Sequence, residues 1–456
     1  MSYLEYFLIS ILYFWGSSTA LSFGVGYFTL YRPVISGLLT GFILGDPSAG
    51  MAAGAVVNLI YMNFVSTGGS FKGDQMLTAI ISAVAAITLN LNMIESAAIA
   101  YPFGFLGILI WKYRLNINSI FVKKFEEEYE KGNNPEINLY NGFLPQLLLY
   151  IMSTAVIITA LFIMNLIGAY AAGLNKILLI IGFGLVIYTS ISLIFKLKDN
   201  KFVLIFVGSL IITLIFNIPS YLIVFTVLLF LFFYSDKDLI KTSYDMRKMG
   251  ILNKNDLIYA WVIWANYSHS CYSFERLQGL TFAHSMKNIF KKLHNDKSEI
   301  MKGIHRHSEF FNTEPNIGTP IIGYIISQEE KAVLNKEQNY NISFVKKGMM
   351  GIAAGLGDSF TQIVLTPLFI SLSVVLCTDG HFSLAVIPVL ILASLILIIS
   401  YTGFMKGYYE GKESLIERVN IVKNSKIKLY FPYIFSGILG VSLGKLILFN
   451  YMYFFR

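Results

Sequence analysis

Charged residues are scarce in this 456-residue chain. Asp, Glu, Lys and Arg make up 14% of it, against about 25% in an average soluble domain, and 55% of its residues are hydrophobic. The ranges 143–163, 177–195 and 383–401 contain no charged residue at all. Each run is close to the roughly 20 apolar residues that a helix needs to cross a bilayer. The chain is therefore predicted to be an integral membrane protein with many spans, not a soluble globular protein.

Cysteine is also rare. The chain has two, Cys271 and Cys377, which are too few for a disulfide framework and have no spacing typical of a metal site. His305, His307 and Glu309 form a dense group of other metal-binding residue types. Positions two apart on a helix point to different faces, however, so these side chains serve a shared ion poorly. No metal or cofactor is therefore expected.

Positive charge exceeds negative charge, with a formal net charge of +8. Lys and Arg cluster in short segments between apolar runs, for example 123–124, 237–248 and 287–302. Such loops are typical of the cytoplasmic side of membrane proteins, so they indicate a lipid bilayer as the partner and argue against nucleic acid. The N-terminus carries Glu5 and lacks a basic segment, so 8–15 is expected to belong to the first apolar helix and not to a signal peptide.

Residues 3–112 form a first block of short apolar segments interrupted by glycine. Small residues let membrane helices approach closely. The stretch 67–74 is different, because it is polar and glycine-rich and lies between the apolar segments 49–65 and 76–91. Irregular backbone at membrane depth persists only when it is buried in protein or lines a wet cavity. The stretch is therefore either a re-entrant hairpin or an exposed loop.

The later apolar runs predict further spans. The run 202–234 is broken at Pro219, so it fits two short crossings or a helical hairpin. The other spans are expected at 143–169 and 175–195, and near 317–327, 348–378, 382–404 and 428–451.

The sharpest change in composition lies between residues 235 and 256, where charged residues crowd together. It divides the chain into a membrane domain at 1–235, a joint at 236–255 and a second membrane domain at 256–456. The segment 256–316 is polar with apolar residues at helical spacing, so its helices are expected to lie at the cytoplasmic surface. The predicted fold is an all-α polytopic membrane protein with two related helical halves and re-entrant hairpin segments.

The two halves share a short sequence. Residues 50–54 and 351–355 are nearly the same pentapeptide, and each lies near a Gly-Asp pair. Matched glycine-interrupted segments point to a transporter's substrate site, although chance is the other explanation in a chain rich in Gly and Ala. Asp358, at the margin of an apolar segment, is either a functional carboxylate or a helix N-cap.

The motifs of both blocks resemble the mannose–fructose–sorbose family of the bacterial phosphotransferase system. The first block is similar to the membrane component IIC, and the second is similar to component IID. The IIC resemblance rests on Arg32-Pro33, Gly45-Asp46, the stretch 50–54, Gly68-Gly69 and Asp74, and the IID resemblance rests on 274–278, 306–315 and 348–358. Together these motifs cover most of the chain.

The resemblance implies a fused IIC–IID unit in the bacterial inner membrane. In that family IIC and IID are separate polypeptides, three copies of each, so a homotrimer of the fused chain is expected. The family moves a sugar that a cytosolic IIB component phosphorylates, with phosphate passed on from phosphoenolpyruvate through IIA. Neither membrane component carries a phosphorylated residue, and none is expected here. A packing role is accordingly preferred for Cys271 over a phosphocysteine role.

The chain departs from the family's pattern at several polar positions. The usual glutamate of IIC is replaced by Asn58, the usual asparagine before the glycine loop by Ser66, and an acidic pair before Arg32 by Gly26-Tyr27. In IID, residues 269–273 and Thr366 differ from the usual residues, and the IID part is expected to be shortened at its carboxyl end.

The expected sugar site lies between the glycine loop of IIC and the 269–276 segment of IID, where polar groups would bind hydroxyls. The candidate substrate-binding residues are Asp74, Asn58, Ser66, His269, Tyr272, Ser273 and Glu275, and the further motif residues are Arg276, Asn312, Thr313 and Asp358. The alternative is a divergent, non-transporting paralogue that acts as a membrane receptor, regulator or assembly partner.

Overall fold

The computed structural model describes residues 1–18, 20, 22–63, 72–171, 173–234, 250–335 and 342–454. Within these ranges the chain folds into helices joined by turns, without a β-strand. The prediction of an all-α polytopic membrane protein is confirmed. Six stretches are long and apolar enough to cross a membrane, by length and composition: Met93–Glu130, Asn138–Gly168, Asn175–Lys196, Ile342–Thr378, Phe382–Glu410 and Lys412–Asn450.

The helices fall into two runs along the chain. The first run contains α1 (Tyr3–Ser17), α2 (Pro33–Leu44), α3 (Pro47–Tyr61), α4 (Gln75–Thr88), α5 (Met93–Ala100), α6 (Gly104–Glu130), α7 (Leu144–Ala171), α8 (Asn175–Lys196), α9 (Asn200–Phe216) and α10 (Ser220–Tyr234). The second contains α11 (Lys254–Tyr267), α12 (Gly279–Leu293), α13 (Lys297–His307), α14 (Thr319–Asn335), α15 (Ile342–Gly357), α16 (Thr366–Thr378), α17 (Phe382–Glu410), α18 (Lys412–Lys423) and α19 (Lys426–Phe454). Short 3-10 or π segments are η1 (Gly26–Phe28), η3 (Tyr101–Phe103), η4 (Asn138–Phe143) and η6 (Asp358–Leu365).

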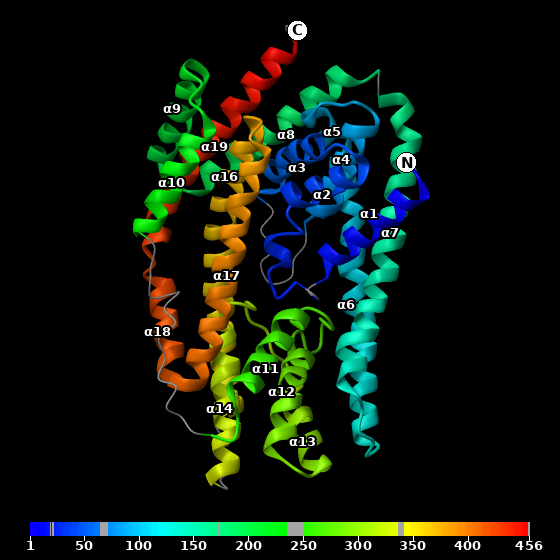
Figure 1. Ribbon diagram of the computed structural model, residues 1–456, viewed down its shortest axis with the longest axis vertical. Helices are drawn as coiled ribbons and strands as arrows, with labels where there is room; N and C mark the ends of the chain where they lie inside the picture. Colours follow the sequence, from blue (N-terminus) through cyan, green and yellow to red (C-terminus); the bar gives the residue numbers. More distant parts are fainter. Residues whose placement is uncertain are drawn as a thin grey trace.

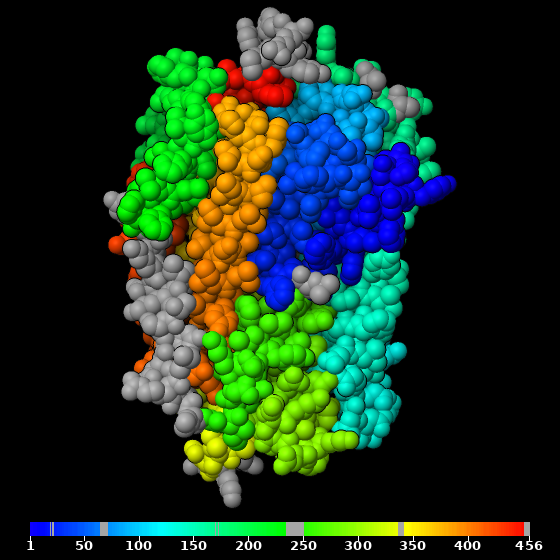
Figure 2. All heavy atoms as spheres, in the orientation of Figure 1, coloured from blue at the N-terminus to red at the C-terminus, as the bar shows by residue number. Residues whose placement is uncertain are grey.

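The molecule has two ends along its long axis. Helices α2–α5, α9, α10 and α16 gather at the upper end in Figure 1, whereas α11–α13, the end of α6, α14 and α18 form the lower end. Long helices, α6, α7, α17 and α19, run along the axis. On the face drawn in Figure 2, the first helices in blue lie directly above the green α11–α13 segment. The two runs of helices are therefore stacked along the axis as well as side by side.

A glycine-rich hairpin of α2 and α3 is packed backbone to backbone. The chain reverses at Gly45, whose φ of +89° suits glycine, and Asp46 caps α3 by accepting a hydrogen bond from the N–H of Ala49 at 2.9 Å. A Cβ at Gly37 would meet the carbonyl oxygen of Gly50 at 2.4 Å. Only glycine permits this approach, because a methyl group there would overlap the facing backbone.

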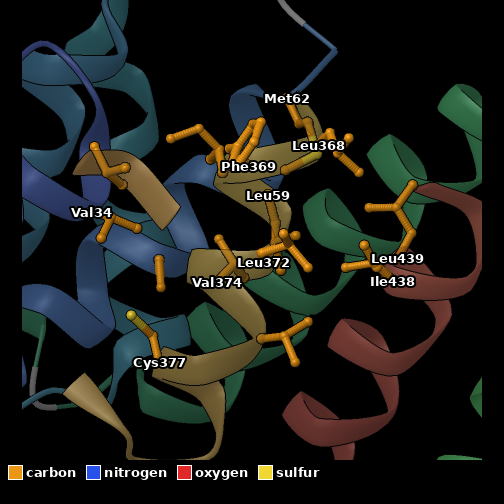
Figure 3. Close-up of a cluster of buried hydrophobic side chains, with 14 of the residues drawn as sticks. Val34, Leu59, Met62, Leu368, Phe369, Leu372, Val374, Cys377, Ile438 and Leu439 are labelled. Atoms are coloured by element: carbon orange, nitrogen blue, oxygen red, sulfur yellow. The ribbon is translucent and has the colours of Figure 1, made fainter. Parts of the chain in front are cut away.

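One hydrophobic core joins the two runs of helices. Val34 of α2 and Leu59 of α3 pack in the same buried cluster as Leu368 and Phe369 of α16 and Ile438 of α19 (Figure 3). The boundaries 1–235 and 256–456 stay a prediction, and residues 236–249 of the expected joint lie outside the described residues. The shared core means that the two parts of the sequence stabilise each other by burying apolar surface.

The outer surfaces of α7–α10 are apolar. Side chains that are at least one-third exposed include Ile151, Phe162, Leu166, Ile180, Phe195, Leu204, Phe216, Phe225 and Phe232. So many exposed apolar side chains would cause aggregation in water, whereas lipid chains accommodate them. The pattern agrees with a multi-pass membrane protein.

The expected spans 143–169 and 175–195 correspond to α7 and α8. The run 202–234 forms α9 and α10, which meet next to Pro219. The segment 317–327, where a span is expected, contributes the first part of α14, a lower-end helix of 17 residues that is not among the six stretches long and apolar enough to cross a membrane.

Asp358 does not cap a new helix. It begins the π segment η6, which continues α15 into α16 without a break. The N-cap alternative is therefore wrong, and the reason is that residues 342–378 form one helical rod. Most of the stretch 67–74, predicted to be a re-entrant hairpin or an exposed loop, lies outside the described part of the chain, which omits residues 64–71.

The two similar pentapeptides predict opposite effects of one substitution. In Gly54→Ala the new methyl group would lie 2.1 Å from the carbonyl oxygen of Pro33, so we expect a loss of about 1–3 kcal/mol in stability. The matched control is Gly355→Ala, where a methyl group would meet nothing within 4 Å and a better helix former replaces glycine. Thermal melting in detergent should fall for the first variant and hold or rise for the second. Equal melting temperatures would refute the backbone-to-backbone packing of α2 and α3.

Candidate functional site

A cavity of about 1050 Å³, open space at its mouth included, lies between the two runs of helices. Its lining comes from the first run (Gly16, Ser17, Ser18, Tyr27, Tyr31, Asp74, Ile110, Trp111, Arg114, Leu149) and from the second (His269, Tyr272, Asn312, Thr313, Glu314, Pro315, Ala354, Asp358, Gln362).

Asp74 stands at the first helical turn of α4. One carboxylate oxygen accepts a hydrogen bond from the N–H of Leu77 at 2.9 Å, and the other accepts one from the hydroxyl of Tyr13 at 2.7 Å. The residue is 2% exposed, and a Cβ at Gly107 would lie 2.2 Å from the Asp74 Cβ, so the missing side chain at Gly107 leaves space for it. The N–H of Met76 and the hydroxyl of Tyr31 also donate toward this carboxylate, so protein donors hold it in place at the cavity wall.

Aromatic rings form part of the cavity wall. The rings of Tyr27 and Tyr31 are stacked with centroids 5.4 Å apart, and Trp111 and Tyr272 add two more rings from α6 and from the α11–α12 loop. The hydroxyl of Tyr272 donates to Asn312 at 3.1 Å, which fixes that ring against the 312–315 segment. Flat apolar faces with polar edges suit a ligand that has both C–H surfaces and hydroxyl groups.

The α11–α12 loop is held by polar side chains of α6. Arg114 donates from Nη2 to the carbonyl oxygens of His269 at 2.7 Å and Ser270 at 3.0 Å. Asn118 donates to the carbonyl oxygen of Tyr272 at 2.9 Å. Both side chains are at most 3% exposed. Groups from the first part of the sequence therefore position the wall contributed by the second part.

Two titratable groups of the second part have shifted pKa values. Burial lowers the pKa of His269 to about 4, with the positive charge of Arg114 adding to the effect, so this imidazole is neutral at neutral pH. Burial raises the pKa of Glu314 to about 7, and the negative charge of Asp358 raises it as well. The Glu314 carboxylate accepts a hydrogen bond from the N–H of Ile317 at 2.6 Å, which fixes the 312–317 turn.

Five of the predicted residues line the cavity in addition to Asp74. They are His269, Tyr272, Asn312, Thr313 and Asp358. His269 and Tyr272 belong to the 269–273 segment, and Asn312 and Thr313 belong to the long motif 306–315.

Other predicted residues lie elsewhere. Ser273 is fully buried and does not line the cavity. The Glu275 side chain, which is 40% exposed, also lies outside the cavity lining and forms an ion pair with Lys123 at 3.3 Å. Arg276 forms an ion pair with Glu126 of α6. Ser66 lies outside the described residues, and Asn58 lines a second, smaller cavity. Tertiary packing, which places adjacent residues on opposite sides of the loop, separates Tyr272 from Ser273.

Several wall residues are absent from the sequence-based prediction. Tyr27, Tyr31, Arg114, Glu314 and Gln362 all line the cavity. Arg114 could have been found, because a lone arginine follows the apolar run 104–111 and an isolated charge beside an apolar segment is a functional candidate. The tyrosines carry no such signal in a chain with 28 of them.

Among the described residues no group of three or more His, Cys, Asp or Glu side chains is placed to hold a metal ion. Cys271 is buried, and burial raises the pKa of its thiol to about 12, which disfavours the nucleophilic thiolate.

Two family models match the chain in consecutive segments. The model described as PTS system sorbose-specific IIC component matches residues 3–230, and the model described as PTS system mannose/fructose/sorbose family IID component matches residues 251–431.

Curated bacterial proteins are similar to parts of the chain. The fructose permease IID component of Bacillus subtilis (strain 168) is 30% identical, over 37% of this chain and 62% of its own length. The mannose-specific EIID component of Escherichia coli (strain K12) is 33% identical, over 32% and 53%, and the sorbose-specific EIIC component of Lacticaseibacillus casei is 27% identical, over 27% and 45%. The chain thus spans about half the length of these relatives.

A solved structure is also similar in part. The cryoEM structure of the mannose transporter ManYZ in complex with microcin E492 shares 27% identity, with a TM-score of 0.34, over 45% of this chain and 70% of that chain.

Proposed function

The chain belongs to the mannose/fructose/sorbose family of phosphotransferase-system membrane components, with IIC and IID sequence in one polypeptide, and we propose that it takes up a hexose-like sugar. A cytosolic IIB partner, supplied with phosphate by IIA, would phosphorylate the sugar. The observation that carries this proposal is the cavity between the IIC and IID parts, since neither part forms its wall alone.

The lining of the cavity supports a sugar as the ligand. Asp74, Glu314 and Asp358 offer carboxylate oxygens to hydroxyl donors, while Asn312 and Gln362 carry amides that can both donate and accept. The tyrosine and tryptophan rings offer surfaces for the C–H face of a sugar ring. A buried polar group left without its hydroxyl costs about 1–3 kcal/mol, so such a site discriminates between ligands. A receptor or regulator without transport would not need a wall shared by both translocation components.

The lower end of the molecule supports a docking face for IIB. Helices α12 and α13 carry Lys287, Lys291, Lys292, Lys297, Lys302 and Arg306, which is the charge pattern of a cytoplasmic surface. Lys292 and Lys302 are more than half exposed, and both can be approached from outside the molecule even though each also pairs with an acidic neighbour. We place this end in the cytosol.

A homotrimer is part of the proposal and rests on the family resemblance. The glycines of α2 and α3 are used within one chain, so they do not support contacts between chains. Fusion guarantees equal amounts of the IIC and IID parts and raises their effective concentration.

The first test of the sugar site is Asp74→Asn. The amide keeps an oxygen to cap α4, so the fold should persist, but it loses one acceptor group for sugar hydroxyls. We expect about a 10- to 100-fold loss of sugar uptake, the size expected for one hydrogen bond to a charged group. Tyr13→Phe is the matched control, because it removes a hydrogen bond to Asp74 and keeps the carboxylate. Wild-type uptake by a stable Asp74→Asn protein would show that Asp74 has only a structural role.

The second test concerns topology. Ser298 of α13 is exposed, and the native Cys271 and Cys377 are buried, so Ser298→Cys introduces one accessible thiol among the described residues. A membrane-impermeant maleimide added to intact cells should not label it, whereas Ile218→Cys, in the link between α9 and α10 at the opposite end, should be labelled. Labelling of Ser298→Cys from outside, with Ile218→Cys protected, would invert the proposed orientation.

The third test is the mass of the purified protein in detergent. Three chains of 51.3 kDa each are expected in one particle, after the detergent is accounted for. A dominant species of one chain across detergents of different harshness would contradict the trimer.

A further inference from the structure

A second cavity adjoins the first. Its volume is about 360 Å³, open space at its mouth included, and it shares two wall residues, Tyr27 and Gln362, with the larger one. Its remaining wall residues are Arg32, Asn58, Tyr61, Met62, Gln75, Thr366, Pro367 and Ile370. This wall, as far as the described residues form it, contains one cation and no carboxylate.

The cation is Arg32, a buried guanidinium without an acidic partner among the described residues. The residue is 8% exposed, and its Nε and Nη2 atoms have no hydrogen-bond partner there. The ion pairs in the described part of the chain, such as those of Lys123, Arg276 and Lys445, do not include Arg32. The guanidinium carbon lies 4.5 Å from the ring centroid of Tyr27, a cation–π contact.

A second donor in the same wall is unpaired. Asn58 is 3% exposed, and its Nδ2 has no partner within the described ranges. A buried polar group without a partner destabilises the fold, and a buried charge without one does so strongly. Two such donors in the wall of one cavity therefore indicate a ligand that supplies acceptor oxygens.

The direction of helix α2 also favours a ligand that carries negative charge. Arg32 directly precedes the first residue of α2, so the positive end of this helix lies at the cavity wall, whereas the nearby N-terminus of α4 is already capped by the Asp74 carboxylate. A cation at the N-terminus of a helix is unfavourable unless an anion accompanies it. The described wall residues supply no such anion: the positions that are acidic in the resembling family, before Arg32 and at 58, are Gly26-Tyr27 and Asn58 here.

We propose that the second cavity binds the carboxylate of an acidic sugar, such as a hexuronate or an aldonate, whose hydroxyl-bearing part lies in the larger cavity. This inference rests on the proposed sugar-binding function and specifies its substrate class. Arg32 binds the carboxylate through its unpaired nitrogens, and Asn58 donates a further hydrogen bond. Tyr27 and Gln362 lie where the two cavities meet and contact the middle of the ligand.

Binding measured on the purified full chain in detergent tests the inference. Glucuronate, galacturonate and gluconate are compared with glucose and galactose, and acetate and inorganic phosphate are the free-anion probes. At least one acidic sugar should bind at least about tenfold more tightly than its neutral counterpart, since hydrogen bonds to a charged group are gained. Arg32→Gln should remove this preference, so that the acidic sugar binds no more tightly than its neutral counterpart.

Asn58→Glu is the second variant, and it keeps the test decisive if Arg32→Gln fails to fold. Its carboxylate should pair with Arg32, raise the melting temperature, and lower the affinity for the acidic sugar at least about tenfold. Neutral sugars that bind as tightly as acidic ones would overturn the inference and leave the proposed uptake function intact. Acetate or phosphate binding as tightly as the acidic sugars would overturn it in favour of a free-anion site. Binding of none of the sugars would overturn both.

Discussion

The carbonyl groups of the α11–α12 loop are the constraint on which the cavity depends. An irregular segment buried in a membrane protein needs protein partners for its backbone, because lipid offers none. Arg114 and Asn118 of α6 provide them, by donating to the carbonyl oxygens of His269, Ser270 and Tyr272. These bonds cross from the IIC part to the IID part. They therefore fix both the loop and the position of the wall residues that it carries.

Buried charge in this molecule follows two patterns. At the lower end it is paired: Arg306 and His307 contact Glu329, and Glu330 accepts hydrogen bonds from the N–H of Leu252 and from Tyr408. Such pairs offset the cost of removing charges from water. Around the cavities the carboxylates Asp74, Glu314 and Asp358 line the larger one, and Arg32 lines the smaller one. The two kinds of charge are therefore divided between two neighbouring cavities that share Tyr27 and Gln362.

Elements set by a local pattern are predicted correctly from the sequence, whereas those set by distant contacts are not. The helices α7 and α8 follow from uninterrupted apolar runs, and the break before α10 follows from Pro219. The charged stretch 329–331 alone indicates a solvated helix end, yet Glu329 and Glu330 are nearly fully buried. Their partners lie in other helices, and no local pattern indicates that those helices are close.

The sequence by itself determined the class of the protein, its helical spans and its family, because hydrophobicity and motif spacing are local properties of the chain. It also placed Asp74, His269, Tyr272, Asn312, Thr313 and Asp358 among the candidate wall residues through motif resemblance. Only the tertiary structure decided which polar residues meet. It separated Tyr272 from Ser273, added Tyr31 and Arg114 to the wall of the larger cavity, and brought Arg32 and Asn58 into the wall of the smaller one, where α2, α3, α4 and the η6–α16 rod converge. Burial and pairing of a charge depend on elements that are far apart in the sequence, so they emerge only when the helices pack.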